Sequence, residues 1–205
     1  MITIEGARRY YQSHDAAHDF DHVLRVLALA ERIASAEGAD LEVVRAAVLL
    51  HDVGRAEQEL TGRSHAELGA ERAREILAHH PPAQVEAVCH AIAAHRFREP
   101  VPPQTLEAEV LHDADKLDAI GAVGIARAYL YGGIREQRLW GEVPMGYQAW
   151  GELPADHTPV HEFVFKLSKL KDTLYTDTAR QIGEERHAYT VGFFQRLRSE
   201  VRGEM

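Results

Sequence analysis

The sequence predicts an all-α fold, and two observations support this prediction. Apolar residues recur at spacings of three and four along most of the chain, which is the pattern of one buried helix face. Segments that alternate apolar and polar residues, as half-buried strands do, are not found, and neither are internal repeats. The 205 residues, 45% of them hydrophobic, suffice for one sizeable core. We therefore expect a single compact helical bundle over residues 1–205.

The first two predicted helices carry clear boundary signals. An apolar face defines a helix over about 20–37, and Gly38 follows as a stop. Asp40 can cap the next helix, because an aspartate side chain accepts hydrogen bonds from the free amides of a first turn. That helix has an apolar face that leads up to His51, and Gly54 ends it.

The middle of the chain continues as helices with polar caps and proline stops. Ser64 and Glu67 form a capping box that starts a third long helix, and Pro81 and Pro82 end it. Further helices are predicted over about 83–96, 105–117 and 121–131, the last of them ended by Gly132 and Gly133.

One long irregular loop is predicted over residues 132–158. It holds Trp140, Tyr147 and Trp150 without a clean period, and long loops in compact domains are often functional. These aromatic side chains suit a nucleobase stack or a lid, and equally core packing or a dimer contact. From about residue 160 two further helices form a C-terminal helical extension.

Charge and composition exclude several classes of function. A net charge of −9 opposes binding of a nucleic acid polymer, because such surfaces carry clustered Lys and Arg, whereas a small phosphorylated nucleotide needs only a local positive site. The single Cys89 cannot form an internal disulfide. No segment has the roughly 18 consecutive apolar residues of a membrane span, and the first residues lack the apolar region of a signal peptide. We therefore expect a cytoplasmic protein that does not bind membranes.

Four residues combine into a candidate metal site. His51 and Asp52 follow a long apolar run, so both side chains are expected to point inward, where polar groups need partners. His22 begins the apolar face of the first long helix, and Asp115 lies one turn after Leu111. Singly, each has an ordinary explanation as a core histidine or a surface carboxylate. Together, two imidazoles and two carboxylates suit a divalent cation.

This ordered set resembles the HD-domain phosphohydrolases, whose pattern of His, then His-Asp, then Asp is matched by His22, His51-Asp52 and Asp115. The strings DHVLRV, LLHDVGR and DADKLDAIG carry the likeness. The string HEFVFKLSKLKDTLYTDTARQIGEERHAY is similar to the small bacterial branch that includes nucleotide pyrophosphohydrolases. The resemblance implies a single HD domain with one bound divalent metal. We expect manganese, with magnesium, iron, nickel, cobalt and zinc as alternatives.

The resemblance also implies roles for further residues. His65 and His95 match positions that bind a second metal in dinuclear members, or that face the substrate phosphate in mononuclear members, where they would serve catalysis. Arg55 is similar to a basic residue that meets phosphate. Arg25, which shares a helix with the first ligand, and Lys116 are further candidates for binding the substrate. An ordinary surface position is the alternative for each of these three cations.

We therefore predict a metal-dependent phosphohydrolase that converts (deoxy)nucleoside triphosphates into monophosphates and pyrophosphate, through attack of a metal-activated water on phosphorus. Four alternatives stay open. They are a nucleotide monophosphatase, a cyclic-nucleotide phosphodiesterase, a di-iron oxygenase, which two metals would permit, and a non-enzymatic nucleotide sensor. A homodimer is compatible with the aromatic loop.

Overall fold

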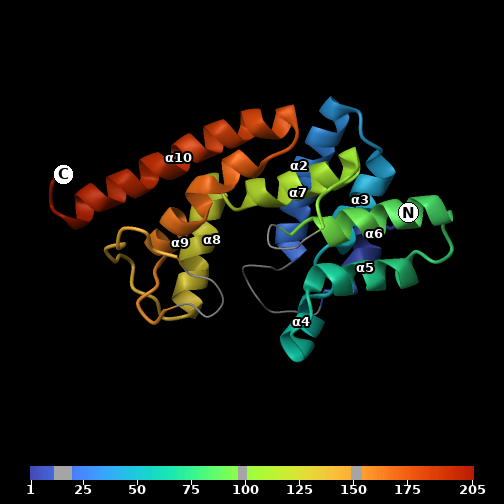
Figure 1. Ribbon diagram of the computed structural model, residues 1–205, viewed down its shortest axis with the longest axis horizontal. Helices are drawn as coiled ribbons and strands as arrows, with labels where there is room; N and C mark the ends of the chain where they lie inside the picture. The colour runs from blue at the N-terminus through green and yellow to red at the C-terminus, as the bar shows by residue number, and fades with distance from the viewer. Residues whose placement is uncertain (12–19, 97–100, 149–153) are drawn as a thin grey trace. The chain divides into compact units, whose positions relative to one another are not determined.

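The computed structural model describes residues 1–11, 20–96, 101–148 and 154–205. Within these ranges the regular elements are helices and none is a strand, which confirms the predicted all-α class (Figure 1). No helix in these ranges combines the length and the apolar character that crossing a membrane requires. The elements in chain order are α1 (Ile4–Arg8), α2 (Phe20–Glu37), α3 (Leu41–Leu50), α4 (Arg55–Thr61), α5 (His65–Ile76), α6 (Pro82–Ala94), α7 (Leu106–Asp118), α8 (Gly121–Ile134), α9 (Pro159–Phe165), the 3-10 helix η1 (Leu167–Thr173) and α10 (Asp177–Val201).

Contacts divide the described chain into two compact units. The first comprises Met1–Asp115 and Leu174–Ala179, and the second comprises Lys116–Thr173 and Arg180–Met205. Each unit is described by itself below. The single domain expected over the whole chain stays a prediction.

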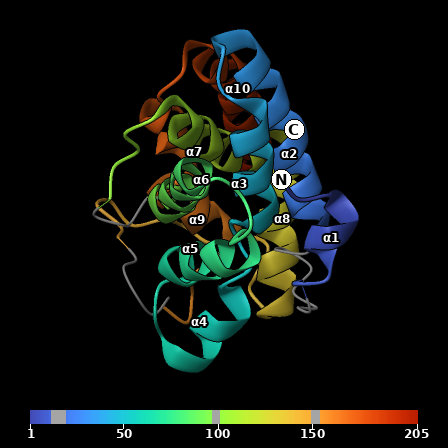
Figure 2. The same cartoon turned by 90° about the vertical axis from the view of Figure 1, so that its right-hand side faces the viewer.

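Helix α3 is the central helix of the first unit. Apart from Arg45, its residues from Val43 to Leu50 are buried, and α1, α2, α5 and α6 contact it. Figure 2 shows α3 between α2 and the pair formed by α5 and α6. Such an apolar helix is stable only where neighbouring helices cover it on several sides. Its cap forms as predicted, since Asp40 Oδ1 accepts a hydrogen bond from the amide of Glu42 at 2.8 Å.

Two glycines allow α5 to pack closely on the end of α3. A Cβ atom on Gly54 would lie 2.6 Å from His65 O and 2.7 Å from Gly69 N, and one on Gly69 would lie 3.0 Å from His51 O. Folded chains do not tolerate such short distances, so this backbone approach depends on the missing side chains. As a consequence, the first turn of α5, with His65, lies beside the turn that follows α3.

Asp113 joins α7 to the segment 174–179 of the first unit. Its Oδ2 accepts hydrogen bonds from the amide and the hydroxyl of Thr176, both at 2.8 Å, and its Oδ1 accepts one from the amide of Tyr175 at 3.0 Å. His112 Nδ1 lies 3.1 Å from the same Oδ1. The carboxylate is fully buried, and these donors satisfy it. This anchor fixes the helix two residues before Asp115.

The second unit has its own small apolar core. Ile125 of α8, Val160 of α9 and Phe194 of α10 are its buried members, and Trp140 packs against them. The observed position of Trp140 corresponds to core packing, one of the alternatives left open above. Tyr129, Val143, Phe163, Phe193 and Leu197 complete the cluster.

The end predicted for α8 was wrong. Gly132 and Gly133 do not break the helix, which continues to Ile134. A Cβ on Gly132 would lie 3.1 Å from the Pro159 ring, and α8 contacts α9. Gly132 therefore serves close helix packing rather than helix termination.

The irregular loop carries the other two aromatic residues singled out above. Tyr147 forms a hydrogen bond through its hydroxyl to His157 Nδ1 at 2.8 Å, and its ring lies edge-on to the ring of His161 at 4.6 Å between centroids. Trp150 lies outside the described residues. The contacts of Tyr147 are thus made inside the second unit.

Candidate metal centre

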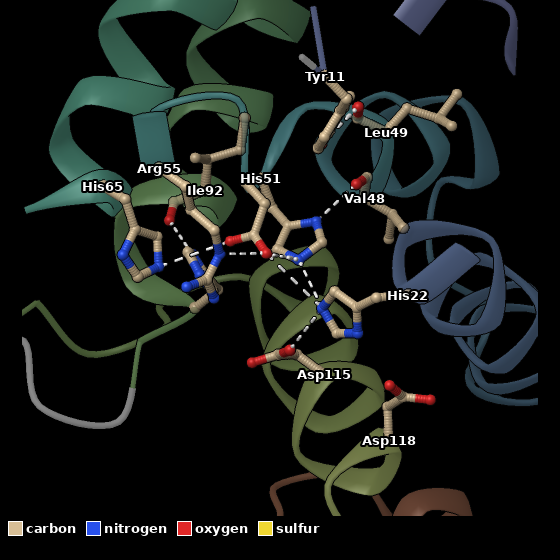
Figure 3. Close-up of polar contacts among 12 residues, drawn as sticks. Tyr11, His22, Val48, Leu49, His51, Arg55, His65, Ile92, Asp115 and Asp118 are labelled. Atoms are coloured by element: carbon tan, nitrogen blue, oxygen red, sulfur yellow. Dashed lines mark hydrogen bonds and ion pairs between the residues drawn. The ribbon is translucent and has the colours of Figure 1, made fainter. Parts of the chain in front are cut away.

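The four predicted metal ligands converge in the first unit. Figure 3 labels three of them, His22, His51 and Asp115. His22 Nε2 lies 3.4 Å from His51 Nε2 and 3.4 Å from Asp115 Oδ1. Asp52 Oδ2 lies 3.7 Å from His22 Nε2 and 3.5 Å from His51 Nε2. Both histidine side chains and Asp52 are buried. The structure therefore brings the four predicted residues together, and their role as ligands stays a prediction.

His65 and His95 form a second group around the same aspartate. One ligand atom each from Asp52, His65 and His95 lie within 4.8 Å of one another, as do atoms of His22, His51 and Asp52. His65 Nε2 lies 3.6 Å from Asp52 Oδ1, whereas the first group meets Oδ2. Asp52 thus presents one carboxylate oxygen to each group.

Three of the histidines hold their rings in one tautomer. In each ring Nδ1 lies within hydrogen-bonding distance of an oxygen that can only accept, so Nδ1 carries the proton and Nε2 keeps its lone pair. Neutral imidazole Nε2 atoms of this kind are good metal ligands. The acceptors are Val48 O for His51 at 2.7 Å, Ile92 O for His95 at 2.6 Å and Gln58 Oε1 for His65 at 2.8 Å.

Burial keeps these rings neutral. It lowers the pKa of His51, lowers the pKa of His95 further, and lowers the pKa of His65 to about 3, where the Arg55 guanidinium adds to the effect. Near neutral pH the three imidazoles therefore present unprotonated Nε2 atoms.

Asp52 provides the test of whether a cation fits here. Burial opposes its ionisation, but the surrounding histidines and Arg55 outweigh burial and hold the pKa of Asp52 well below its usual range. Arg55 Nε lies 2.6 Å from Asp52 Oδ2, yet among the described residues neither oxygen of Asp52 takes part in a hydrogen bond of good geometry. A buried carboxylate without hydrogen bonds is costly. Its charge, with the Nε2 lone pairs around it, fits a divalent metal ion.

The predicted substrate-binding residues differ in their surroundings. Arg55 is the first residue of α4 and is paired with Asp52. Arg25 is half-buried on α2, and Lys116 is buried on α7 directly after Asp115. Their roles toward a substrate stay predictions.

Sequence reasoning missed three residues near the site. Tyr11 donates its hydroxyl to Leu49 O at 3.1 Å, and its burial together with the charge of Asp52 raises the pKa of Tyr11 well above its usual value. Gln58 accepts from His65, and Arg96 donates to Ser64 Oγ at 3.4 Å. No spacing pattern distinguishes these residues, because tertiary packing alone brings them to the site.

Comparison with known proteins agrees with this arrangement of residues. The model of the HD domain family matches residues 19–120, the range that contains all six histidine and aspartate side chains of the two groups. The uncharacterized protein YpgQ of Bacillus subtilis is 34% identical over 209 residues, which cover 97% of this chain and 94% of YpgQ. The chain therefore belongs to the HD domain family, and this membership supports a metal-dependent phosphohydrolase in general, as predicted.

Solved structures show the same fold. The crystal structure of Bacillus subtilis YpgQ in complex with ADP superimposes with a TM-score of 0.76 at 32% identity, covering 98% of this chain and 99% of that one. A predicted HD superfamily hydrolase from an uncultured Thermotogales bacterium gives a TM-score of 0.68 at 34% identity, covering 96% of this chain and 90% of that one. Ribonuclease Y of Chloroflexus aurantiacus is 34% identical over 117 residues, but these make up 21% of its length.

Proposed function

We propose that this protein hydrolyses (deoxy)nucleoside triphosphates to the monophosphate and pyrophosphate, with a divalent metal held by His22, His51, Asp52 and Asp115. The observation that carries the proposal is the buried, ionised Asp52. Among the described residues its oxygens are paired with Arg55 but make no hydrogen bond of good geometry, and they lie near the unprotonated Nε2 atoms of His51 and His65. The complex of YpgQ with ADP supports a small nucleotide as the ligand.

The metal's contribution is Lewis acidity. A bound divalent cation makes water more acidic and offsets the negative charge that develops on phosphoryl oxygens. The protein's part is to keep the ligand atoms in place: the backbone carbonyls of Val48 and Ile92 hold His51 and His95 in the tautomer that leaves Nε2 free. Manganese is the ion that we propose, and mixed nitrogen and oxygen ligation also suits magnesium, iron, nickel, cobalt and zinc.

Arg55 is the proposed contact for the substrate phosphates. Its guanidinium is held in an ion pair with Asp52, so a phosphate oxygen near the metal would meet a positive charge in a fixed position. Arg25 and Lys116 are proposed as further phosphate contacts on the strength of the sequence.

His65 and His95 are proposed to serve catalysis beside the metal. With Nε2 3.6 Å from Asp52 Oδ1, His65 is placed to take part in proton transfer during hydrolysis. The same geometry supports a second metal ion between Asp52, His65 and His95, which is the alternative role of these residues.

The test is product analysis with metal-stripped protein. It is incubated with nucleoside mono-, di- and triphosphates, with and without manganese, and pyrophosphate is separated from orthophosphate. We expect manganese-dependent pyrophosphate in equal amount to the nucleoside monophosphate. Orthophosphate as the only product would indicate a phosphatase instead. Saturable nucleotide binding without turnover would indicate a sensor, and oxygen consumption by the iron-loaded protein would indicate an oxygenase.

A further inference from the structure

Gln58 lies beneath the first turn of α5. It belongs to α4, a short helix that ends at Gly62 in the left-handed conformation (φ 73°), after which the chain turns back into α5. Gln58 is half-buried, and α4 contacts α5. The side chain therefore reaches a helix N-terminus, where backbone amides lack partners within the helix.

Two contacts of Gln58 with His65 assign the protons without ambiguity. The amide N of His65 lies 3.1 Å from Gln58 Oε1, and His65 Nδ1 lies 2.8 Å from the same atom. A backbone N–H can only donate, so the Gln58 atom that it meets is the carbonyl oxygen. Because that oxygen can only accept, Nδ1 of His65 must carry the ring proton. Nε2 is left with its lone pair, 3.6 Å from Asp52 Oδ1.

The position of His65 explains why a side chain, and not the backbone, must accept the proton of its Nδ1. His51 and His95 are the C-terminal caps of α3 and α6, and each donates Nδ1–H to the carbonyl three residues earlier. His65 is instead the first residue of α5, where the residue three positions earlier is Gly62, outside the helix. Gln58 supplies the acceptor that the backbone supplies to the other two histidines.

We propose that Gln58 is a positioning residue: it fixes the Nδ1–H tautomer of His65 and thereby keeps Nε2 available toward Asp52, as a base or a metal ligand. This inference rests on the proposed function of the site. Partners that fix the tautomer of a working histidine are commonly worth about 10 to 100-fold in activity or metal affinity.

The first test reads the tautomer directly in metal-free protein. Long-range proton-nitrogen NMR at pH 8 distinguishes protonated from unprotonated ring nitrogens. We expect an Nδ1–H, bare Nε2 pattern for His65 in the wild type and in Gln58→Glu, which keeps an acceptor. In Gln58→Leu the proton is expected to move at least partly to Nε2. Gln84→Leu, which changes a half-buried glutamine of α6, is the control and should leave His65 unchanged.

The second test follows turnover in the same proteins with manganese. We expect kcat to fall by about tenfold or more in Gln58→Leu, with little change in KM, and to recover in Gln58→Glu. Circular dichroism verifies that each variant is helical.

Each test has an outcome that overturns the inference. Nε2–H on His65 in the wild type would do so without any variant, and so would a Gln58→Leu protein with unchanged tautomer and kcat. Wild-type protein that hydrolyses no nucleotide would instead overturn the proposed function, since the tautomer is read without metal or substrate.

Discussion

His51 and Asp52 are neighbours in the chain, and their functional atoms also meet: His51 Nε2 lies 3.5 Å from Asp52 Oδ2. Consecutive residues of a regular helix diverge by a large angle, so their side chains do not face each other. The two residues follow α3, which ends at Leu50, and the turn there allows them to converge. The effect of removing one partner can therefore be tested without changing the helix.

Asp52→Asn is expected to remove metal binding without unfolding the protein. In metal-free protein the variant should still fold but be less stable than the wild type, because the neutral amide loses the ion pair with Arg55 and the interactions that hold the pKa of Asp52 well below its usual range. Manganese at about 100 times its Kd should stabilise the wild type by about 2.7 kcal/mol and the variant not at all. Thermal unfolding with manganese and then with a chelator measures both effects. A variant whose Tm still rises with manganese would contradict this role of Asp52.

Asp113→Asn is the matched substitution on α7 and should keep the response to metal that Asp52→Asn loses. The carboxylate of Asp113 accepts hydrogen bonds from Tyr175 and Thr176, so its loss should reduce the free energy of unfolding by about 2 to 3 kcal/mol. The rise in Tm with manganese should persist. Urea unfolding of the metal-free variant checks the first expectation, and equal stability to the wild type would show that this anchor is dispensable.

Arg55→Ala should weaken substrate binding more than it slows turnover. Loss of one charge-assisted contact to phosphate predicts an increase of about tenfold in KM, and Arg55→Lys should not restore it fully, because an ammonium cannot reproduce a bidentate guanidinium. Steady-state kinetics with Arg25→Ala alongside measures whether the second arginine contributes. Unchanged KM in Arg55→Ala would remove Arg55 from the phosphate site.

Gly54→Ala should destabilise the first unit and impair the site together. The added Cβ would lie 2.6 Å from His65 O and 2.8 Å from Leu68 Cβ, so α5 must shift, at a cost of about 1 to 3 kcal/mol. Gly192→Ala is the control, because a Cβ at this position of α10 meets no atom within 4 Å. Alanine there should stabilise the helix by about 0.5 to 1 kcal/mol. Denaturant unfolding of both variants compares them, and equal effects would refute the packing argument.

The second unit should lose stability in weak acid because of two buried histidines. Burial lowers the pKa of His157 and of His161 below the ordinary value of 6.5. Above about pH 7 both are neutral whether the chain is folded or unfolded, so they do not affect its stability. As the pH falls, the unfolded chain takes up protons first, and the folded state loses stability until the lower folded pKa is passed. Urea unfolding between about pH 7.5 and 5.5 should show a shallower decline for His161→Gln than for the wild type. Equal declines in stability for the two proteins would contradict the assignment of this pH dependence to His161.

The sequence predicted the helices with apolar faces from their periodicity. It predicted the four candidate ligands from their places beside those faces together with the family resemblance. It did not predict α4, whose string RAEQELT buries none of its residues and so shows no apolar face. Gln58 was missed with that helix. Its role depends on a distance to His65, seven positions away, that only the turn at Gly62 and the close packing of Gly54 determine. The glycine pair in α8 was misinterpreted because a stop signal and a close packing contact look the same in a sequence.

The convergence of the candidate ligands from distant segments also bears on how the folded chain opens locally. His22 and His51 are 29 positions apart, and Asp115 lies on α7. An ion bound to all of them would act as a reversible crosslink, so that α2 and α3 could not separate until it had left. Hydrogen exchange of their amides should therefore slow as the free metal concentration rises. The amides of α4, a short helix without buried residues, should exchange at a rate that responds far less to the ion.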